Sequence, residues 1–550
     1  MPTFSKSRLS RRVFLETAVA AGAMATLPFA PAKAAAKYTR YNATSPQGQK
    51  MLASYAKGVE KMLSLQATDP QNWFRNAFVH FLDCPHGNWW FYVWHRGYVG
   101  FFEETIRNLS GDQDFAMPYW DWTALPQIPD QMFDGPLTPT DHLFEPYTGN
   151  IEKFTGFIQA PIETFWNGLS PAQKAQQTAR GYTSFDLVWG DVNGYSAAAQ
   201  AAIAGNAAYA NTCGARYLSK DNPKLDKDTA YDCSKFVITS GLLAPDFYNA
   251  NNYLSFNSSK TASHVIQPGG ATKFSVLEGM PHNNVHNYIG GVGAIDSADV
   301  YFQNNGPYGN MTNFLSPVDP VFFLHHSNMD RLWDVWTRKQ QAAGQPYGPD
   351  KADAKTYMDE PFLYFVNGKG QFVGPSKAED YFSMSRFDYT YEPGSGEEVV
   401  TDAKVSHKTV PPTAAKVSGN GATVSVSADA VKAHLAEGSP HPLVASVTLP
   451  RPTGLSSVRT FDVLVNAPPG VTHVDADSPF YAGTIAFFGP IMPGMKMSTD
   501  ATFAVPLPRT LHAFTALGAT AKAAALTIRV VPAHGGGHPP MLKSVSVGTL

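Results

Sequence analysis

Two adjacent histidines inside an apolar run constrain this chain more than any other feature. His325 and His326 lie between Asp319 and Trp336, and the proline after Asp319 is typical of the first helical position. The apolar spacing predicts a buried helix. A buried imidazole needs a partner for each ring nitrogen, and Asp330, one turn beyond His326, can supply only one. Taken alone, the pair is either a set of satisfied core histidines or a metal site.

Further histidines in apolar stretches favour the metal site. His282 and His286 are four residues apart, which places both on one face of a predicted helix. His80, His86 and His95 lie in an aromatic-rich stretch nearer the N-terminus. Seven of the 16 histidines therefore fall in a few apolar segments that are expected to be buried.

The residue types around these histidines narrow the choice of metal. A di-iron bundle would supply glutamates and a Glu-x-x-His pattern. A hydrolytic zinc helix would read His-Glu-x-x-His, whereas Asn283 follows His282 here. Sites built only from nitrogen donors suit copper best, with zinc as the second choice. Two sets of three histidines would hold two copper ions that face each other and bind O2 together.

Length and charge limit the domain count and the partners. A chain of 550 residues is expected to form two or three domains. Its 42 basic and 45 acidic residues give a net charge of −3, and no basic block is present. This balance argues against nucleic acid and against an anionic membrane surface as partners.

The N-terminus has the pattern of an export signal. Residues 10–15 carry a twin-arginine motif, an apolar run follows over 18–30, and 32–34 offer a cleavage site. The run is too short for a permanent membrane anchor. We therefore predict that residues 1–34 are a twin-arginine signal peptide and that the mature protein is periplasmic or secreted.

The hydrophobic pattern of the sequence changes near residue 394. Before it, apolar spacing predicts a mainly helical domain over 35–393, with helices at 51–64, 72–82 and 89–109 and an alanine-rich one near 196–210. Residues 394–415 form a Pro/Gly-containing linker. Beyond it, period-two alternation predicts a C-terminal β-sandwich over 416–550, with strands near 423–427, 461–465, 526–530 and 545–547.

In combination, the histidine-bearing motifs resemble those of the tyrosinase and polyphenol oxidase family of type-3 dicopper proteins. The matching pieces are His86-Gly-x-Trp, Trp94-His-Arg, Pro118-Tyr-Trp-Asp-Trp, Pro281-His-x-x-Val-His and the run from Asp319 to Trp333. Arg40 and the Tyr389-x-Tyr391 ending are similar to further family features. The resemblance implies a mainly α protein, in which a four-helix-bundle dicopper catalytic domain precedes the smaller β-sandwich domain.

The resemblance also implies a role for individual residues. One copper ion would be held by His80, His86 and His95, and the other by His282, His286 and His326. His325 would then pack behind the ligands, and Asp330 would orient a ligand imidazole.

Four other residues match family positions near the copper ions. Cys84 would be joined to His86 by a thioether, the alternative being a buried free thiol. Glu278 and Asn283 would hold a water that takes the proton of a monophenol, although Glu278 is also compatible with a helix surface. Phe314 resembles the gate phenylalanine of the family.

The C-terminal residues resemble the domain that covers the copper site in plant proenzymes. We therefore expect residues 416–550 to act as a lid that inserts a bulky side chain, with Tyr481 and Phe488 as candidates. The alternative is an ordinary stabilising domain. Residues 492–497 carry methionine donors and residues 534–538 carry histidine donors, and both could pass copper inward. The alternative is that the methionines only pack in the core and that the histidines belong to a disordered tail. Cys213 and Cys233 are either a disulfide or two free thiols.

Three functions compete on this sequence. The first is a tyrosinase that hydroxylates monophenols and oxidises o-diphenols with O2. The second is an oxidase of o-diphenols or o-aminophenols only. The third is a haemocyanin-like O2 carrier. The expected cofactors are two copper ions and the expected partners are O2 and small phenols, while assembly into a homo-oligomer stays open.

Overall fold

The computed structural model describes residues 36–148, 151–192, 216–291, 309–402, 412–436, 441–452, 458–489, 494–517, 524–533 and 538–550. The predicted signal peptide, the alanine-rich helix near 196–210, Cys213 and His534 lie outside the described residues. Contacts group the described residues from Tyr38 onward into one compact unit. Among the described residues, no helix is both long and apolar enough to cross a membrane.

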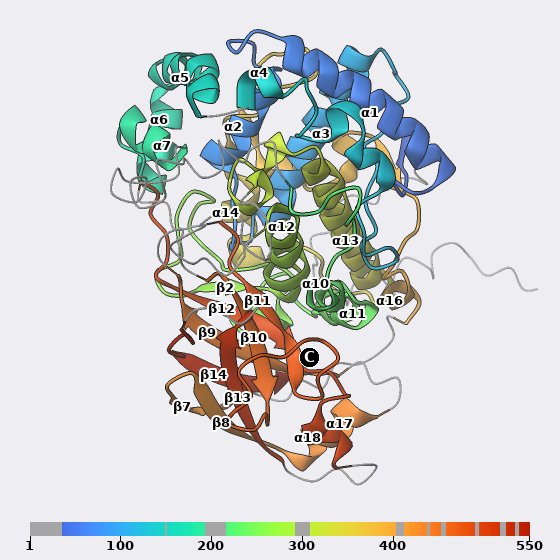
Figure 1. Ribbon diagram of the computed structural model, residues 1–550, viewed down its shortest axis with the longest axis vertical. Helices are drawn as coiled ribbons and strands as arrows, with labels where there is room; N and C mark the ends of the chain where they lie inside the picture. Colours follow the sequence, from blue (N-terminus) through green and yellow to red (C-terminus); the bar gives the residue numbers. More distant parts are fainter. Residues whose placement is uncertain are drawn as a thin grey trace, which may run out of the picture. The chain divides into compact units, whose positions relative to one another are not determined.

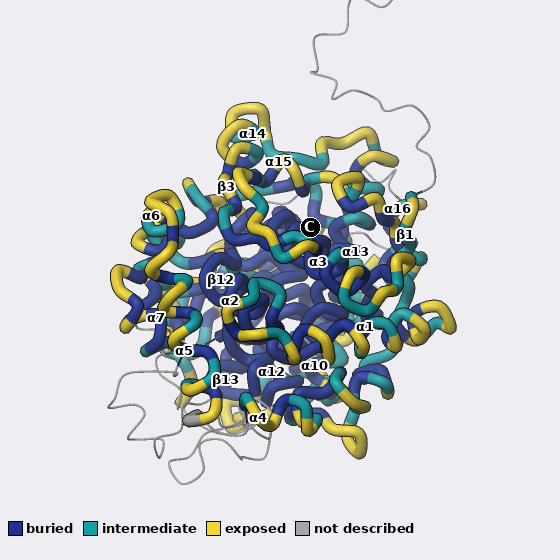
Figure 2. Tube along the Cα trace, turned by 90° about the horizontal axis from the view of Figure 1, so that it is seen from above, coloured by how far each residue is buried: buried dark blue, intermediate teal, exposed yellow. Residues whose placement is uncertain are grey.

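Four helices of the N-terminal part correspond to predicted ones, and the first of them, α1 (Pro46–Ser64), lies along the outer edge of that part (Figures 1 and 2). The others are α2 (Trp73–Asp83), α3 (Phe91–Ser110) and α13 (Val321–Ala342). Helices α2, α3 and α13 begin within two residues of their predicted first residues, whereas α1 begins earlier than predicted. Helix α13 begins one residue later than predicted, with Pro320 and not Asp319 as its N-cap, and the Asp319 carboxylate accepts a hydrogen bond from the Val321 backbone N–H at 3.0 Å. The same carboxylate binds the Arg216 guanidinium through two hydrogen bonds of 2.6 and 2.7 Å.

A wide helical turn precedes the short helix α12 (Asn283–Gly290). Residues Glu278–His282 form a π-helix, and Pro281 lies inside it. Proline has no backbone N–H to give to the ordinary helical ladder, and π-turns frequently occur at functional sites. The turn is continuous with α12, so His282 and His286 lie close together, with ring centroids 4.6 Å apart.

The two ends of the helical part are tied together by a buried charge cluster. Strand β1 (Tyr38–Arg40) pairs in parallel with β5 (Tyr389–Tyr391). Arg40 donates hydrogen bonds to Glu103 at 2.9 Å, to Asp330 at 3.1 Å and to the Tyr391 hydroxyl at 2.9 Å. Because the ion pairs have little access to water, they fix residues from distant parts of the sequence in one arrangement.

Shorter elements complete the helical part. The α-helices are α4 (Glu145–Thr148), α5 (Ile151–Asn167), α6 (Pro171–Arg180), α7 (Phe185–Val192), α10 (Lys227–Asp232), α11 (Lys235–Leu242), α14 (Lys351–Met358), α15 (Ala378–Tyr381) and α16 (Glu398–Thr401). The 3-10 turns are Asp130–Phe133, Gly135–Leu137, Asn252–Leu254, Asn310–Thr312, Ser316–Val318 and Met384–Arg386, and a small sheet pairs β3 (Pro361–Phe362) with β4 (Ser376–Lys377).

The C-terminal residues form two five-stranded sheets. One has the order β11-β10-β13-β8-β7 and the other β2-β12-β9-β14-β6. The bounds are β2 (Thr272–Phe274), β6 (Thr413–Ala414), β7 (Lys416–Ser418), β8 (Gly421–Val426), β9 (Leu443–Pro450), β10 (Thr460–Val465), β11 (Tyr481–Ala486), β12 (Asp500–Pro506), β13 (Ala524–Pro532) and β14 (Ser544–Thr549), with helices α17 (Ala428–Leu435) and α18 (His512–Thr515).

Both sheets contribute to one apolar core, which also receives residues from the helical part. Val463 and Ile528 come from one sheet, Val447 and Phe503 from the other, and Met280 from the π-turn. Strand β2 precedes the π-turn in the sequence, yet it pairs in parallel with β12. The sequence does not predict this strand. Its pairing joins the C-terminal sheets directly to the segment that carries His282.

Candidate metal centre

The seven histidines of the three apolar segments come together in the structure. His80 is on α2, His95 is on α3, and His86 is in the loop between these helices. His282 ends the π-turn, His286 is on α12, and His325 and His326 are on α13. Their potential ligand atoms form two groups, within each of which all donors lie within 4.8 Å of one another: His80, His86 and His95 in the first, and His282, His286, His325 and His326 in the second.

The two groups face each other. The rings of His95 and His326 are stacked with centroids 4.2 Å apart, and those of His86 and His282 are 5.8 Å apart. Each group therefore presents its imidazoles to a shared space between α3 and α13.

Local hydrogen bonds fix the orientation of most of these imidazoles. The Nδ1 atoms of His80, His95 and His286 lie 2.7, 2.7 and 2.8 Å from the backbone carbonyl oxygens of Phe314, Phe91 and Met311, respectively. A carbonyl oxygen only accepts, so Nδ1 carries the proton and Nε2 is left as a bare donor. Such a hydrogen bond to the second ring nitrogen is the usual companion of a metal-ligating histidine.

The Nε2 atoms of these histidines have no backbone hydrogen-bond partner among the described residues. Those of His80, His86, His95 and His282 are buried without any hydrogen bond. The Nε2 atoms of His286 and His326 lie 3.1 Å from each other. His286 carries its proton on Nδ1, so its Nε2 either accepts a hydrogen bond from His326 Nε2–H or is free to bind a cation. An unsatisfied buried polar group normally costs about 1–3 kcal/mol, and one metal ion in each group would satisfy the unpaired nitrogens of that group.

Electrostatics keep the imidazoles in the form that binds a metal. Burial lowers the pKa of His80 to about 3 and that of His282 to about 3. The pKa values of His86, His95, His286 and His326 are also lowered, by burial first and by neighbouring imidazoles second. Neutral imidazole is the metal-binding species. A donor set of imidazoles without a carboxylate fits copper better than iron or magnesium.

His325 lies nearer to the second group than expected. The sequence places it behind the ligands, but its imidazole is part of the group of four, and both of its ring nitrogens are buried without partners. Its ring centroid is 4.8 Å from that of Trp122 and 5.2 Å from that of His282.

The role expected of Asp330 is wrong in this structure. Its carboxylate accepts hydrogen bonds from Arg96 at 2.7 Å, from Tyr391 at 2.7 Å, and from Tyr389 and Arg40. The Nδ1 of His326, one helical turn away, is buried without a partner. Two arginines and two tyrosine hydroxyls compete more strongly for this carboxylate than a neutral imidazole, because charged hydrogen bonds are stronger than neutral ones.

Glu278 and Asn283 are both buried beside the histidines. The Glu278 carboxylate accepts from the Gly87 N–H at 2.5 Å and from the Ser258 hydroxyl. Burial raises the pKa of Glu278 to about 8, although these two hydrogen bonds lower it. The side-chain oxygen of Asn283 lies 2.9 Å from His282 Nδ1, so the amide holds this imidazole directly.

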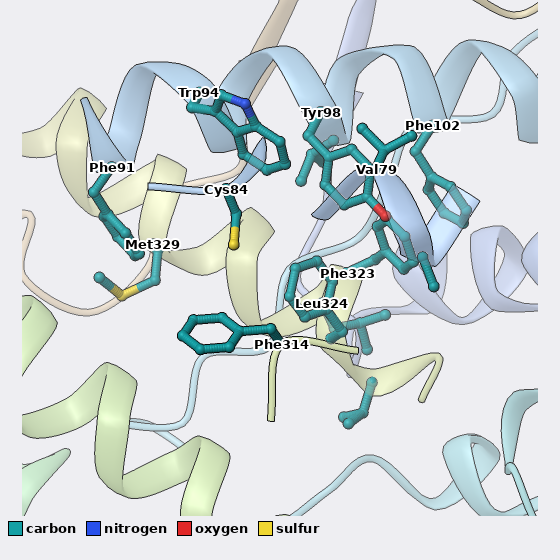
Figure 3. Packing of buried hydrophobic residues seen from close by; sticks show 14 of the residues in the cluster. Val79, Cys84, Phe91, Trp94, Tyr98, Phe102, Phe314, Phe323, Leu324 and Met329 are labelled. Atoms are coloured by element: carbon teal, nitrogen blue, oxygen red, sulfur yellow. The ribbon is translucent and has the colours of Figure 1, made fainter. Parts of the chain in front are cut away.

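Cys84 and Phe314 also lie at the centre. The Cys84 Sγ is 3.3 Å from His86 Nδ1, and burial raises the pKa of this free thiol. The Phe314 ring centroid is 5.3 Å from that of His86. Figure 3 shows Cys84, Phe91 and Phe314 in one packed aromatic environment beside α3.

One aromatic ring of the C-terminal part covers the histidines. The centroid of Phe488 is 4.4 Å from that of His286, 4.9 Å from His86 and 5.5 Å from Phe314. Gly489, which follows, has a φ of +70°, a conformation that favours glycine. Tyr481, the other candidate, lies elsewhere and packs against Tyr231 with centroids 5.3 Å apart.

Three asparagines on α12 hold the end of β11 and Phe487, which directly precede Phe488, and two of the three are not predicted from the sequence. The side-chain amides of Asn283, Asn284 and Asn287 donate to the backbone carbonyls of Ala486, Thr484 and Phe487 at 2.9, 2.9 and 3.0 Å. We call these bonds the asparagine clamp. The signal for it was three asparagines interleaved with two histidines on a buried helix, where polar residues need partners.

A small cavity remains beside the Phe488 ring. Its volume is about 20 Å³, and its walls include Cys84, His86, Phe314, Met495 and Met497. A space of this size holds roughly one water molecule. Met495 and Met497 thus lie on a wall that they share with a histidine of the first group.

Known proteins resemble this chain in sequence and in fold. The family model described as the common central domain of tyrosinase matches residues 43–339, which is more than half of the chain. The chain belongs to the tyrosinase family. The match contains all seven histidines of the two groups, and this family consists of type-3 dicopper proteins.

Similar relatives include plant and bacterial proteins. A chloroplastic polyphenol oxidase II of Ipomoea batatas is 24% identical over 356 residues, which cover 62% of this chain and 47% of the relative. A tyrosinase of Hahella sp. (strain CCB-MM4) is 23% identical over 318 residues, 52% of this chain and 50% of the relative. The matched region thus spans about half the length of these curated relatives.

A solved structure shares the fold. It is a recombinant latent aurone synthase (polyphenol oxidase) with 16% identity and a TM-score of 0.53, and the alignment covers 94% of this chain and 90% of that one. The alignment therefore extends over the helical part and the C-terminal sheets.

Proposed function

We propose that this tyrosinase-family protein is a copper-dependent oxidoreductase that uses O2 to oxidise phenols to o-quinones. The observation that carries the proposal is the set of buried imidazoles whose bare Nε2 atoms converge in two facing groups. His80, His86 and His95 would hold one copper ion, and His282, His286 and His326 the other. Bound copper would supply the redox chemistry with O2.

The choice of His326 over His325 has support in the structure. The Nε2 of His326 lies 3.1 Å from that of His286 and its ring stacks on that of His95 in the first group. His325 instead packs against Trp122, on the side of the second group. We therefore assign the ligand role to His326 and a packing role to His325.

The residues around the histidines support the release of a proton from the substrate. A phenol has a pKa near 10, so a base must take its proton before the oxygen binds a metal. Glu278 has a pKa of about 8, in the range of an effective general base near neutral pH. Asn283 holds His282 at 2.9 Å and completes the polar wall. This pair supports ortho-hydroxylation of monophenols in addition to oxidation of o-diphenols.

The C-terminal part is proposed to act as a lid. Phe488 lies where a phenol ring would approach the histidines, which supports a latent state with the C-terminal residues closed over the site. Phe314 would gate the same space. On this reading the helices α2, α3, α12 and α13 form a four-helix dicopper bundle, and the two C-terminal sheets form a sandwich.

Two features concern maturation of the enzyme. Cys84 Sγ lies 3.3 Å from the His86 ring, which supports a thioether between these residues once copper is bound. The twin-arginine motif of residues 10–15 supports export to the periplasm or the medium. Export by this route occurs after folding and would suit a protein that acquires copper in the cytoplasm.

Oxygen uptake with two substrates tests the proposal. Copper-loaded protein should consume O2 with a monophenol and with an o-diphenol, whereas the zinc-loaded protein should consume none. Uptake with the o-diphenol alone would support the narrower oxidase and remove the role of Glu278 and Asn283. Reversible O2 binding that leaves both substrates unchanged would contradict an enzyme and support a carrier.

A further inference from the structure

Two arginines line the cavity beside Phe488, and no carboxylate does. Arg180 ends α6 in the helical part, and Arg451 follows β9 in the C-terminal part. Both are buried, with 5% and 7% of their surface exposed. The same cavity touches His86, Asn283 and the Phe488 ring. It therefore adjoins the metal centre directly.

Neither cation is neutralised by the described residues. The Nη1 and Nη2 atoms of Arg180 both donate to the Cys84 carbonyl at 3.1 Å, and its Nε is buried without a partner. The Nε of Arg451 donates to the Ser498 carbonyl at 3.2 Å. The arginines that do pair with carboxylates in the described residues are Arg40, Arg96, Arg107, Arg216, Arg338 and Arg386.

Buried charges of one sign are costly unless something compensates them. Removing an ion from water costs several kcal/mol, and two like charges at one cavity add repulsion. Burial lowers the pKa of Arg451 to about 10, which leaves it charged at neutral pH. Guanidinium groups bind carboxylates through charged, often paired, hydrogen bonds. Among the described residues, these two guanidinium groups therefore form a site that is suited to an anion.

We propose that Arg180 and Arg451 bind the carboxylate of the substrate, so that the enzyme prefers phenolic acids to neutral or cationic phenols. The inference rests on the proposed function and names its substrate class. The substrate ring would take the place of the Phe488 ring, and its acidic side chain would extend into the cavity between the arginines. An ammonium group has no acidic partner on this wall, so tyramine should be a poorer substrate than a phenolic acid.

The test uses matched substrates in the full chain carrying Phe488→Ala, which frees the ring space while retaining both arginines. We expect kcat/KM for 3,4-dihydroxyphenylpropionate to exceed that for neutral 4-methylcatechol by about tenfold or more, the least expected of a charged hydrogen bond. Adding Arg180→Gln or Arg451→Gln should reduce this ratio mainly through KM. The ratio is taken within one protein sample, so partial folding or copper loading cancels.

Control variants and a second readout separate the possible failures. Arg180→Lys retains the charge and should keep part of the preference, whereas Arg386→Gln, at an arginine far from the cavity, should change nothing. Calorimetric titration of the metal-free Phe488→Ala chain with phenylpropionate and with its amide compares the two binding affinities without turnover. Equal affinity for acid and amide, together with equal kcat/KM values, would overturn the inference. Acid-selective binding without oxidation of either catechol would instead contradict the proposed function and leave the carboxylate site standing.

Discussion

The metal centre and its cover are held by different kinds of bonds. The imidazoles of His80, His95 and His286 are oriented by backbone carbonyls within the helical part, so the orientation depends on the fold itself. The Phe488 ring is positioned by three side-chain amides of the asparagine clamp and by apolar packing. Side-chain bonds of this kind contribute about 0.5–1.5 kcal/mol each. Asn283 also holds His282, so we expect the cover to be loosened without disturbing the histidines only through Asn284 or Asn287.

The largest expected effect comes from breaking the metal centre itself. His282→Ala should lower the copper content from two ions per chain to one and reduce o-diphenol oxidation by more than about 100-fold, the upper range for residues that only support a ligand. Copper is measured by atomic absorption on the same samples used for kinetics. His434→Gln changes a histidine that is equally buried but belongs to the C-terminal part, and should leave both values unchanged. Two copper ions in His282→Ala would contradict the ligand assignment.

A smaller effect is expected from weakening the asparagine clamp. Asn284 donates to the Thr484 carbonyl at 2.9 Å and to Asp232 at 2.8 Å, so Asn284→Ala removes one hydrogen bond from each acceptor, while Asp232 still accepts from the Thr484 N–H. The expected loss of stability at the contact is about 1–3 kcal/mol. The variant should gain o-diphenol oxidase activity at a lower urea concentration than the wild type.

The matched control for this variant is Asn420→Ala. The Asn420 amide donates to the Val530 carbonyl at 3.0 Å inside the C-terminal sheets and makes no bond to α12. The same chemical change should therefore leave the urea concentration of activation unaltered. Equal behaviour of the two variants would show that the clamp does not hold the cover.

The smallest expected effect is that of pH on the thermal stability of the protein. Burial raises the pKa of Asp228 to about 7 and raises those of Asp232 and Asp462. Asp228 and Asp232 belong to the helical part and Asp462 to β10, and the nearby Lys227 is exposed and paired with Asp475 and Asp477. A raised carboxyl pKa favours the protonated folded form.

The sign of the pH effect follows from these shifts. For Asp228 the stabilisation is complete below the unfolded pKa of about 4 and is lost as pH rises through its folded pKa of about 7. For Asp232 and Asp462 it is likewise lost as pH rises through their raised pKa values. Thermal unfolding should therefore start at a lower temperature at pH 8 than at pH 5.5, by about 1 °C for each kcal/mol lost in a chain of this length. Asp462→Asn removes one of these carboxyl groups and should reduce the difference in unfolding temperature between pH 5.5 and pH 8. An unchanged difference would exclude this carboxyl group as its source.

The sequence predicts the clustering of the histidines better than it predicts what surrounds them. The seven histidines could be found because imidazoles at helical spacing in apolar runs have few structural uses, and the helices that carry them begin near the predicted residues. The partners of Asp330 could not be found, because Arg40, Tyr389 and Tyr391 reach it only through tertiary packing. Strand β2 was missed because three residues carry too little periodicity, and its partner β12 is more than 200 positions away. Phe488 was one of two lid candidates, which only the three-dimensional contacts separate.

The most direct test of the account compares Phe488→Ala with Tyr481→Ala in the uncut, copper-loaded chain. Both substitutions truncate a buried aromatic residue of the same C-terminal segment, but only Phe488 contacts the histidines. O2 uptake with 4-methylcatechol should rise about tenfold or more in Phe488→Ala, equivalent to 1.4 kcal/mol or more of barrier, and should stay at the wild-type rate in Tyr481→Ala. Wild-type rates in both variants, or an equal rise in both, would contradict the claim that the Phe488 ring covers a dicopper site.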